Sequence, residues 1–197
     1  MRILVLDELS AVRLAGRISE KTAIISIVGK GRKGIRFPEN GNVVGILHLR
    51  LNDVDWGERT VGSGLPPKRE DFEGLGEFVG NALRDGVEIL LIHCGSGISR
   101  SPATASAVAK KYGLWNGYWR KRYYYPNLRV YEAACAELGE ECSDDEIRTL
   151  YEERKRNSCW NAATPKGWDF EDVRRARMKE KASEERRRKK KNRSGSE

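Results

Sequence analysis

The feature that most constrains the fold is an apolar run that ends in a cysteine. Residues 87–93, "VEILLIH", have the length of a strand and the near-continuous apolar character typical of strands buried on both faces. Cys94 follows, then a loop with two glycines. A small-residue helical pattern begins at Ser101-Pro102, where Ser suits the N-cap and Pro the first helical position. The pattern predicts a buried strand, a tight loop and a helix.

Predicted strands and predicted helices alternate along the chain before residue 87. Because strands that alternate with helices form sheets covered on both faces, we expect an α/β fold with a central, mostly parallel sheet flanked by helices. In such folds ligands bind at the carboxyl ends of the strands, which is where Cys94 lies. The expected strands are residues 2–7, 22–28 and 43–51, and the expected helices are residues 8–21 and 68–86.

Beyond residue 113 the sequence is mainly helical. A helix is expected to end at Gly139, and another to begin with a capping box of Ser143 and Glu146. The last residues have too little apolar content to form a core. We therefore predict a main domain over residues 1–140, a helical C-terminal extension over 141–180 and a basic, disordered tail over 181–197.

The composition and the distribution of charge indicate which kinds of protein this chain can be. The 197 residues carry a net charge of +8, of which +5 belongs to residues 169–197. No stretch is long and apolar enough for a membrane span, and "MRILVL" is followed at once by two acids, so we expect no secretory signal and a cytoplasmic protein. The four cysteines lack zinc-site spacing, so we expect free thiols and no metal site.

The loop after Cys94 has the composition of an anion-binding nest. It consists of Gly95, Ser96, Gly97, Ile98 and Ser99, with no acid among them. Glycines allow positive φ, so that successive amides can turn inward, and the following helix directs unpaired N–H groups and partial positive charge into the loop. The loop is therefore predicted to bind phosphate.

Three side chains around this loop suggest phosphoryl chemistry. A cysteine beside an arginine and a helix N-terminus is favoured as a thiolate, which is a nucleophile. Arg100 can hold two oxygens of a phosphoryl group with its planar fork. Ser101 can donate a hydrogen bond to the Cys94 thiolate when it leaves phosphorus.

The same six-residue offset separates Cys142 from Arg148, but in a different setting. The intervening "SDDEI" contains three acids and no glycine, and it lies on a predicted helix. That segment would repel an anion, so only Cys94 is a candidate nucleophile.

The stretch "HCGSGISRS" resembles the signature His-Cys-x5-Arg-Ser/Thr of the cysteine-dependent protein tyrosine and dual-specificity phosphatases. The resemblance implies a phosphatase-like catalytic domain over residues 1–140. It also implies a two-step reaction without metal or cofactor, in which Cys94 forms a cysteinyl-phosphate that water hydrolyses. In that family the histidine at the position of His93 is structural.

The family also uses an Asp from an upstream loop as general acid. The stretch "LRLNDVDWG" follows a predicted strand and offers Asp53 and Asp55, of which Asp53 is favoured because it comes sooner after the strand. Both lie farther from Cys94 than is usual in small members, and the Gly/Pro-rich stretch at 57–67 accounts for the extra length. Asp71 is expected to serve only as a favourable charge in the first turn of a helix.

The predicted function is hydrolysis of phosphotyrosine in proteins, with phosphoserine and phosphothreonine left open. The alternatives are an RNA 5′-triphosphatase or another phosphatase of the same superfamily, a phosphate-binding pseudophosphatase or adaptor, and, more distantly, a sulfur transferase. A phosphoinositide substrate is disfavoured because the loop contains no lysine. The expected partner is a phosphorylated protein, with weak polyanion or nucleic-acid contact through the tail. The sequence determines neither the physiological substrate nor the oligomeric state.

Two further stretches have both a ligand-binding and a purely structural interpretation. Residues 115–125 interleave six aromatic side chains with three cations, which suits either base stacking or packing beneath the loop. The stretch "GKGRKG" at 29–34 lacks the Gly-Lys-Ser/Thr of a nucleotide-binding loop, and we expect a basic surface loop there.

Overall fold

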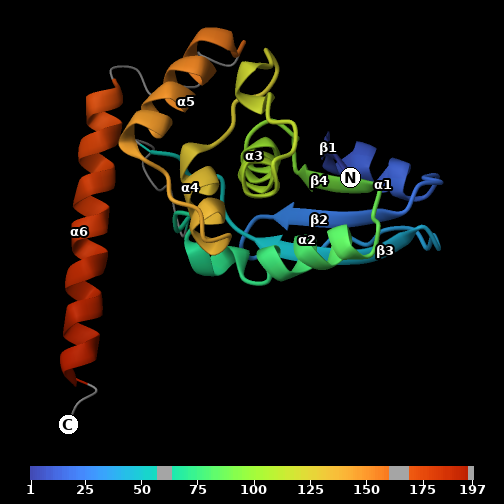
Figure 1. Cartoon of the computed structure of the whole chain (residues 1–197), viewed down its shortest axis with the longest axis horizontal. Coiled ribbons are helices and arrows are strands. Elements are labelled where there is room, and N and C mark those ends of the chain that lie inside the picture. Colours follow the sequence, from blue (N-terminus) through green and yellow to red (C-terminus); the bar gives the residue numbers. More distant parts are fainter. Residues whose placement is uncertain (57–63, 160–168, 195–197) are drawn as a thin grey trace.

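The fold is built on a four-stranded sheet in which all neighbouring strands are parallel (Figure 1). The computed structural model describes residues 1–56, 64–159 and 169–194. The strand order is β1-β4-β2-β3. The strands are β1 (Arg2–Asp7), β2 (Thr22–Val28), β3 (Val43–Arg50) and β4 (Ile89–Cys94). This confirms the predicted α/β fold with a parallel sheet.

Burial along each strand follows its place in the sheet. Every residue of the two central strands, β2 and β4, is buried, as their β-branched and aliphatic sequences indicate. In β3, an edge strand, partly buried residues alternate with exposed ones for most of its length. The run that ends in Cys94 is therefore a central strand, and its carboxyl end is fixed from both sides.

Helices cover both faces of the sheet, with the larger core on one side. The helix α1 (Glu8–Ala15) packs Ala11 and Ala15 against the first face. The opposite face carries α2 (Leu75–Arg84), α3 (Arg100–Tyr112) and α4 (Leu128–Glu137). The alanines of α3 keep its side chains short, which allows this helix to run close to the sheet and buried along most of its length.

The helix expected at residues 68–86 is divided in two. A short 3₁₀ helix, η1 (Arg69–Phe72), precedes α2, and Gly74 between them has a φ of +81°. A left-handed residue cannot continue a right-handed helix, so the chain turns there. Three apolar side chains of this segment, Phe72, Leu75 and Val79, are all in the core.

The helix α5 (Asp144–Asn157) begins where the sequence indicated. The Ser143 Oγ accepts a hydrogen bond from the Glu146 amide at 3.1 Å, as expected of an N-cap. Ile147 and Tyr151 are buried in the same core cluster as the helices on the sheet. The segment after residue 140 is thus packed onto the main domain, and the boundaries given above stay a prediction.

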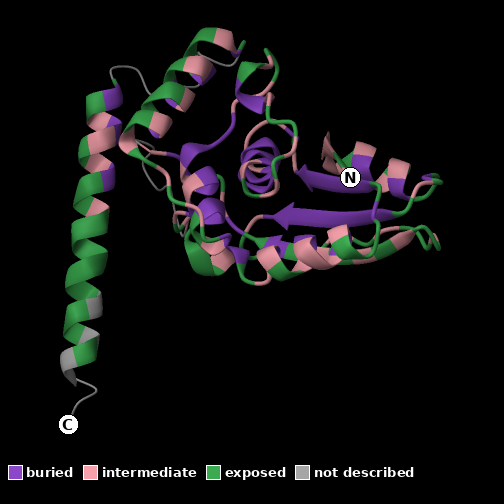
Figure 2. Ribbon diagram, viewed as in Figure 1, coloured by how far each residue is buried: buried purple, intermediate pink, exposed green. Residues whose placement is uncertain are grey.

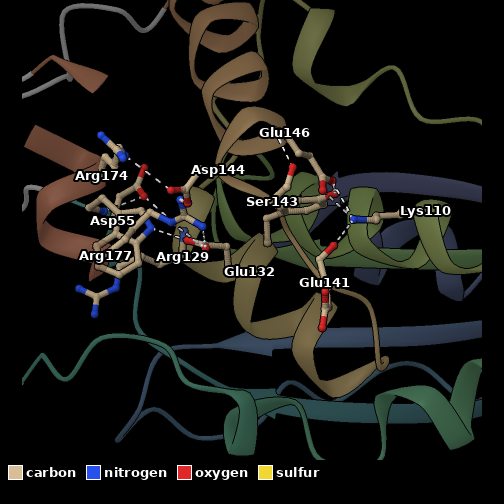
Figure 3. A network of polar contacts seen from close by, with 12 residues as sticks. Asp55, Lys110, Arg129, Glu132, Glu141, Ser143, Asp144, Glu146, Arg174 and Arg177 are labelled. Carbon is tan, nitrogen blue, oxygen red and sulfur yellow. Dashed lines mark hydrogen bonds and ion pairs between the residues drawn. The ribbon is translucent and has the colours of Figure 1, made fainter. Parts of the chain in front are cut away.

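The last helix, α6 (Phe170–Ser194), includes the described part of the tail, where we expected disorder. The described part of the tail has no proline or glycine and many Glu, Lys and Arg residues, which are good helix formers. Its first half is attached: the Arg177 guanidinium, 1% exposed, donates to Glu132 of α4 and Asp144 of α5 (Figure 3). The described side chains of its second half are exposed (Figure 2).

Two smaller findings concern the membrane and the thiols. Within the part of the chain that the structure describes, no helix combines the length and apolarity that a membrane crossing requires. The cysteines, which all fall within the described ranges, are free: Cys94, Cys135, Cys142 and Cys159.

Candidate active site

The loop after Cys94 joins β4 directly to α3, but the helix begins earlier than predicted. Its N-cap is Ser99 and its first residue is Arg100, so the assignment of Ser101 as N-cap was wrong. The Ser99 hydroxyl donates to Asp53 Oδ1 at 2.6 Å instead of capping an amide. Pro102 lies in the first turn, where a missing N–H leaves no helical hydrogen bond unmade.

The carbonyls and the amides of the loop differ in their hydrogen bonding. The carbonyls of Gly95 and Ile98 accept from the amides of Glu8 (3.1 Å) and Tyr125 (2.9 Å), and Ser99 O accepts from Ala103 N at 3.3 Å. Among the described residues, by contrast, no group accepts a hydrogen bond from a backbone amide between positions 95 and 99. Consecutive amides without acceptors at a helix N-terminus form an anion-binding site.

Gly97 is required by its conformation and by its surroundings. Its φ is +72°, and a Cβ added to it would lie 2.7 Å from Asp7 N and 2.7 Å from Leu6 C. Both atoms belong to the backbone of β1, which cannot move aside. Any side chain here would therefore push the loop off the end of the sheet.

Cys94 lies at the base of the loop beside a hydroxyl. Its Sγ is 3.2 Å from Ser101 Oγ, and both residues are buried. The preceding His93 contacts Ser26 Oγ at 2.9 Å through Nε2 and is also buried. Burial lowers the pKa of His93, so its imidazole is neutral near pH 7. These contacts fit a nucleophile with a supporting hydroxyl and a structural histidine.

Arg100 extends back over the loop from the first turn of α3. Its Nη1 donates to Leu51 O at 3.1 Å, and its Nη2 is 3.7 Å from where a Cβ on Gly95 would be. Its Nε is buried without a hydrogen-bond partner and lies 3.6 Å from Asp53 Oδ2. The guanidinium thus lies between the loop and the segment after β3.

The two candidate acids have different environments. Asp53 is partly exposed beside the loop, and its Oδ1 accepts from Ser99 Oγ and from Asn127 Nδ2 at 3.0 Å. Asp55 is buried and faces away: its Oδ1 accepts from the Trp56 and Leu128 amides at 2.8 and 3.2 Å, and its Oδ2 accepts from Arg154. Of the two, Asp53 is the one that contacts the loop after Cys94.

Two residues at this site were not anticipated from the sequence. Asn127, which N-caps α4 through its Oδ1, uses its amide nitrogen on Asp53. Arg154 of α5 reaches Asp55 from 99 positions along the chain. The "PN" before a helical pattern signals an N-cap at Asn127, but no local pattern signals either long-range contact.

Other residues considered above lie outside the loop. Arg148, the partner in the second Cys/Arg spacing, donates to Glu171 of α6 at 3.2 Å, and Cys142 precedes α5. Asp71 lies in η1 and pairs with Lys30 of the 29–34 loop at 2.7 Å. The 57–67 stretch expected to lengthen the acid loop falls mostly outside the described residues.

The aromatic stretch at 115–125 is divided between core and surface. Tyr118 and Trp119, in the short helix η2 (Tyr118–Arg120), are buried, and Trp119 Nε1 donates to Ser106 Oγ at 2.6 Å. Trp115 and Tyr123 are exposed. Part of the stretch therefore packs beside α3, and the remainder forms a surface.

No protein-family model matches the chain, and no curated protein sequence does. Among solved structures it is similar to three phosphatases of the tyrosine or dual-specificity type, the group whose signature the Cys94 stretch resembles.

One is Tk-PTP in its active form, with 16% identity, 79% of this chain and 92% of that chain covered, and a TM-score of 0.37. Another is human DUSP28, with 16% identity, coverage of 82% and 95%, and a TM-score of 0.41. A third is a mouse dual specificity phosphatase complexed with zinc tungstate, with 18% identity, 75% of both chains covered and a TM-score of 0.33.

Proposed function

We propose that this protein is a cysteine-dependent phosphatase that hydrolyses phosphotyrosine in proteins, with phosphoserine and phosphothreonine as further candidate substrates. The observation that carries the proposal is the arrangement of the loop. Along the chain, five loop amides for which the described residues offer no acceptor lie between Cys94, whose Sγ is 3.2 Å from Ser101 Oγ, and Arg100, the first residue of α3. A phosphoryl group there would meet donors on its oxygens and a nucleophile at phosphorus.

The first step transfers the phosphoryl group to the enzyme. The Cys94 thiolate attacks phosphorus, the S–P bond forms and the ester P–O bond breaks. The leaving oxygen takes a proton from Asp53. We assign that proton to Oδ2, because Oδ1 already accepts hydrogen bonds from Ser99 and Asn127.

The second step releases phosphate. Water attacks phosphorus and gives a proton to the Asp53 carboxylate, and the S–P bond breaks. The electron pair returns to Cys94, where the Ser101 hydroxyl 3.2 Å away donates to the thiolate. Asp53 is thereby protonated and Cys94 is ionised for the next cycle, so atoms and charge balance without a metal or cofactor.

Arg100 binds the phosphoryl oxygens in this scheme. Its buried Nε has no hydrogen-bond partner among the described residues, so an incoming anion would satisfy it. A planar guanidinium can hold two oxygens at once and stabilise the transition state. Retention of this arginine together with the nucleophile and Ser101 favours an enzyme over a phosphate-binding adaptor.

An RNA 5′-triphosphate is the second candidate substrate, and the charge of α6 favours it. The segment 181–194 contains eight Lys/Arg and two Asp/Glu, and its described side chains are exposed. A positive helix of this kind would attract a polyanionic substrate to the enzyme. The chemistry at Cys94 would be unchanged.

The test is a substrate panel with EDTA present. Phosphotyrosine and phosphothreonine peptides and 5′-triphosphate RNA are each incubated with the wild type, with Cys94→Ser and with Cys142→Ser as the matched control. We expect turnover of phosphotyrosine by the wild type and by Cys142→Ser and none by Cys94→Ser. If the wild type hydrolyses only the RNA, the second candidate is the substrate. Full activity of Cys94→Ser would refute the mechanism.

A further inference from the structure

We infer that Arg154 of α5 is a positioning residue for the general acid, holding the loop that carries Asp53 against the phosphate-binding loop. The inference rests on the proposed function, in which Asp53 donates the proton. It assigns a role in the chemistry to the C-terminal helical segment, which the sequence presents only as an extension.

Arg154 connects two segments that both lead to Asp53. Its Nη1 donates to Asp55 Oδ2 and also to Pro126 O, the latter at 2.8 Å. Asp55 is two residues after Asp53 in the acid-bearing loop, and Pro126 precedes Asn127, which donates to Asp53 Oδ1 at 3.0 Å. One guanidinium therefore fixes the acid's own loop and the residue that orients the acid.

The segment before Asn127 is also tied to the phosphate-binding loop. The Tyr125 amide donates to Ile98 O at 2.9 Å, and the Arg154 guanidinium carbon lies 4.2 Å from the centre of the Tyr125 ring. A cation over an aromatic face is attractive and restricts the positions of both groups. Arg154 thus holds the acid-bearing loop and the loop that binds phosphate in a fixed relation.

Burial makes this connection rigid. The Arg154 and Asp55 side chains are only 4% and 8% exposed. Removing one partner of a buried ion pair leaves a charge without compensation, whereas an exposed pair contributes little. The geometry of general acid catalysis is demanding, because the proton donor must reach hydrogen-bond distance of the leaving oxygen.

A loss of positioning has a signature that a loss of stability does not share. Protonation of the leaving group contributes about 10²- to 10⁴-fold to the rate and matters most for poor leaving groups. Displacement of Asp53 should therefore slow a substrate with a phenol of pKa about 10 and spare an activated one. A merely unstable variant would lose the same fraction of activity on both.

The experiment compares variants of the full-length chain on phenyl phosphate and 4-nitrophenyl phosphate. The variants are Arg154→Met, Arg154→Lys, the double variant Asp55→Asn/Arg154→Met, which removes both buried charges, and Asp53→Asn as the reference for a missing acid. The matched control is Lys110→Met, which removes the ion pair between α3 and Glu146 of α5 without touching the acid-bearing loop (Figure 3).

For Arg154→Met we expect kcat/KM on phenyl phosphate to fall about 10- to 100-fold, a part of the full contribution of a general acid. On 4-nitrophenyl phosphate the change should stay within about threefold, and the basic limb of the pH–rate profile should weaken. Arg154→Lys should recover part of the loss. If Arg154→Met does not fold, the double variant and Arg154→Lys provide the same comparison.

Other outcomes separate this inference from the proposed function. Leaving-group dependence in Asp53→Asn but in none of the Arg154 variants would overturn the role of Arg154 and leave the function intact. Equal losses of kcat/KM on both substrates in the Arg154 variants would also overturn the role of Arg154 and leave the function intact.

Amide hydrogen exchange of the peptide spanning residues 51–56 is a second readout that does not need activity. It should be faster in Arg154→Met and unchanged in Lys110→Met, and unchanged exchange in both would contradict the inference. An inactive wild type with fast exchange in Arg154→Met would refute the function alone.

Discussion

The guanidinium of Arg100 and the carboxylate of Asp53 lie side by side at the loop after Cys94, 3.6 Å apart from Nε to Oδ2. The same guanidinium donates to Leu51 O, two residues before Asp53. The proposed phosphate clamp and the proposed acid are therefore already adjacent without substrate. A bound phosphoryl group would lie against both.

Replacing Arg100 by lysine keeps the charge but removes the planar fork. We expect kcat on a phosphotyrosine peptide to fall about 10²- to 10³-fold, because the fork stabilises the transition state more than the ground state. Arg69→Lys is the matched control, since Arg69 is exposed and pairs with Glu137 far from the loop. Wild-type steady-state kinetics in Arg100→Lys would show that this arginine does not bind the phosphoryl group.

Gly97→Ala tests the shape of the loop. The added Cβ would meet the β1 backbone at 2.7 Å in a residue with positive φ, so we expect both reduced stability and loss of turnover. Gly113→Ala is the control, because Gly113 also has positive φ but nothing lies within 4 Å of its Cβ position. The control should lose only about 1–2 kcal/mol, the cost of a left-handed alanine. Similar denaturation midpoints and kinetics for both variants would argue against the tight packing of the loop.

Asp53→Asn and Asp55→Asn should fail in different ways. Asp53→Asn should keep its stability and turn over phenyl phosphate about 10²- to 10⁴-fold more slowly, with little change on an activated substrate. Asp55→Asn leaves Arg154 buried without its counter-charge, which costs about 3–5 kcal/mol of folding free energy. Urea denaturation and kinetics of both variants provide the comparison. An unchanged free energy of unfolding in Asp55→Asn would contradict the anchoring role of that residue.

His93 gives the protein a stability that depends on pH. Burial lowers its folded-state pKa from 6.5, so the unfolded chain binds a proton more readily than the folded protein as the pH falls below about 6.5. Stability is therefore highest above that pH and decreases below it, down to the folded-state pKa. His93→Gln cannot take the proton, and its free energy of unfolding should depend less on pH between 6.5 and 5.

The control for that variant is His48→Gln, at an exposed position of β3. An identical pH dependence in wild type and His93→Gln would mean that protonation of His93 does not limit acid stability.

The parts of this site that lie close together in the sequence are the parts that the sequence predicts. The strand, the glycine loop and Arg100 follow one another within a few residues, so local rules for strands, nests and helix starts apply to them. The helix α3 begins at Arg100, earlier than predicted, and its N-cap Ser99 uses its hydroxyl on Asp53, a contact between residues 46 positions apart. Asn127 and Arg154 act across 74 and 99 positions, and no periodicity carries that information.

The tail shows the opposite case. Its composition predicted disorder because it cannot bury a core; its described side chains are exposed, but they belong to the helix α6. The attachment of the helix lies before the tail, where Arg177 donates to two carboxylates and Phe170 and Val173 belong to the core cluster. The composition does not reveal that one charged side chain, that of Arg177, is buried and only 1% exposed.

The most direct test of the central claim is to trap the intermediate. The full-length protein is mixed with a phosphotyrosine peptide in EDTA, quenched in acid within the first turnovers, and digested for mass spectrometry. The account predicts one added phosphoryl group on the peptide that contains Cys94, in the wild type and more abundantly in Ser101→Ala, which releases the thiolate more slowly. Turnover with no phosphoryl group on Cys94, or with the group on another residue, would contradict it.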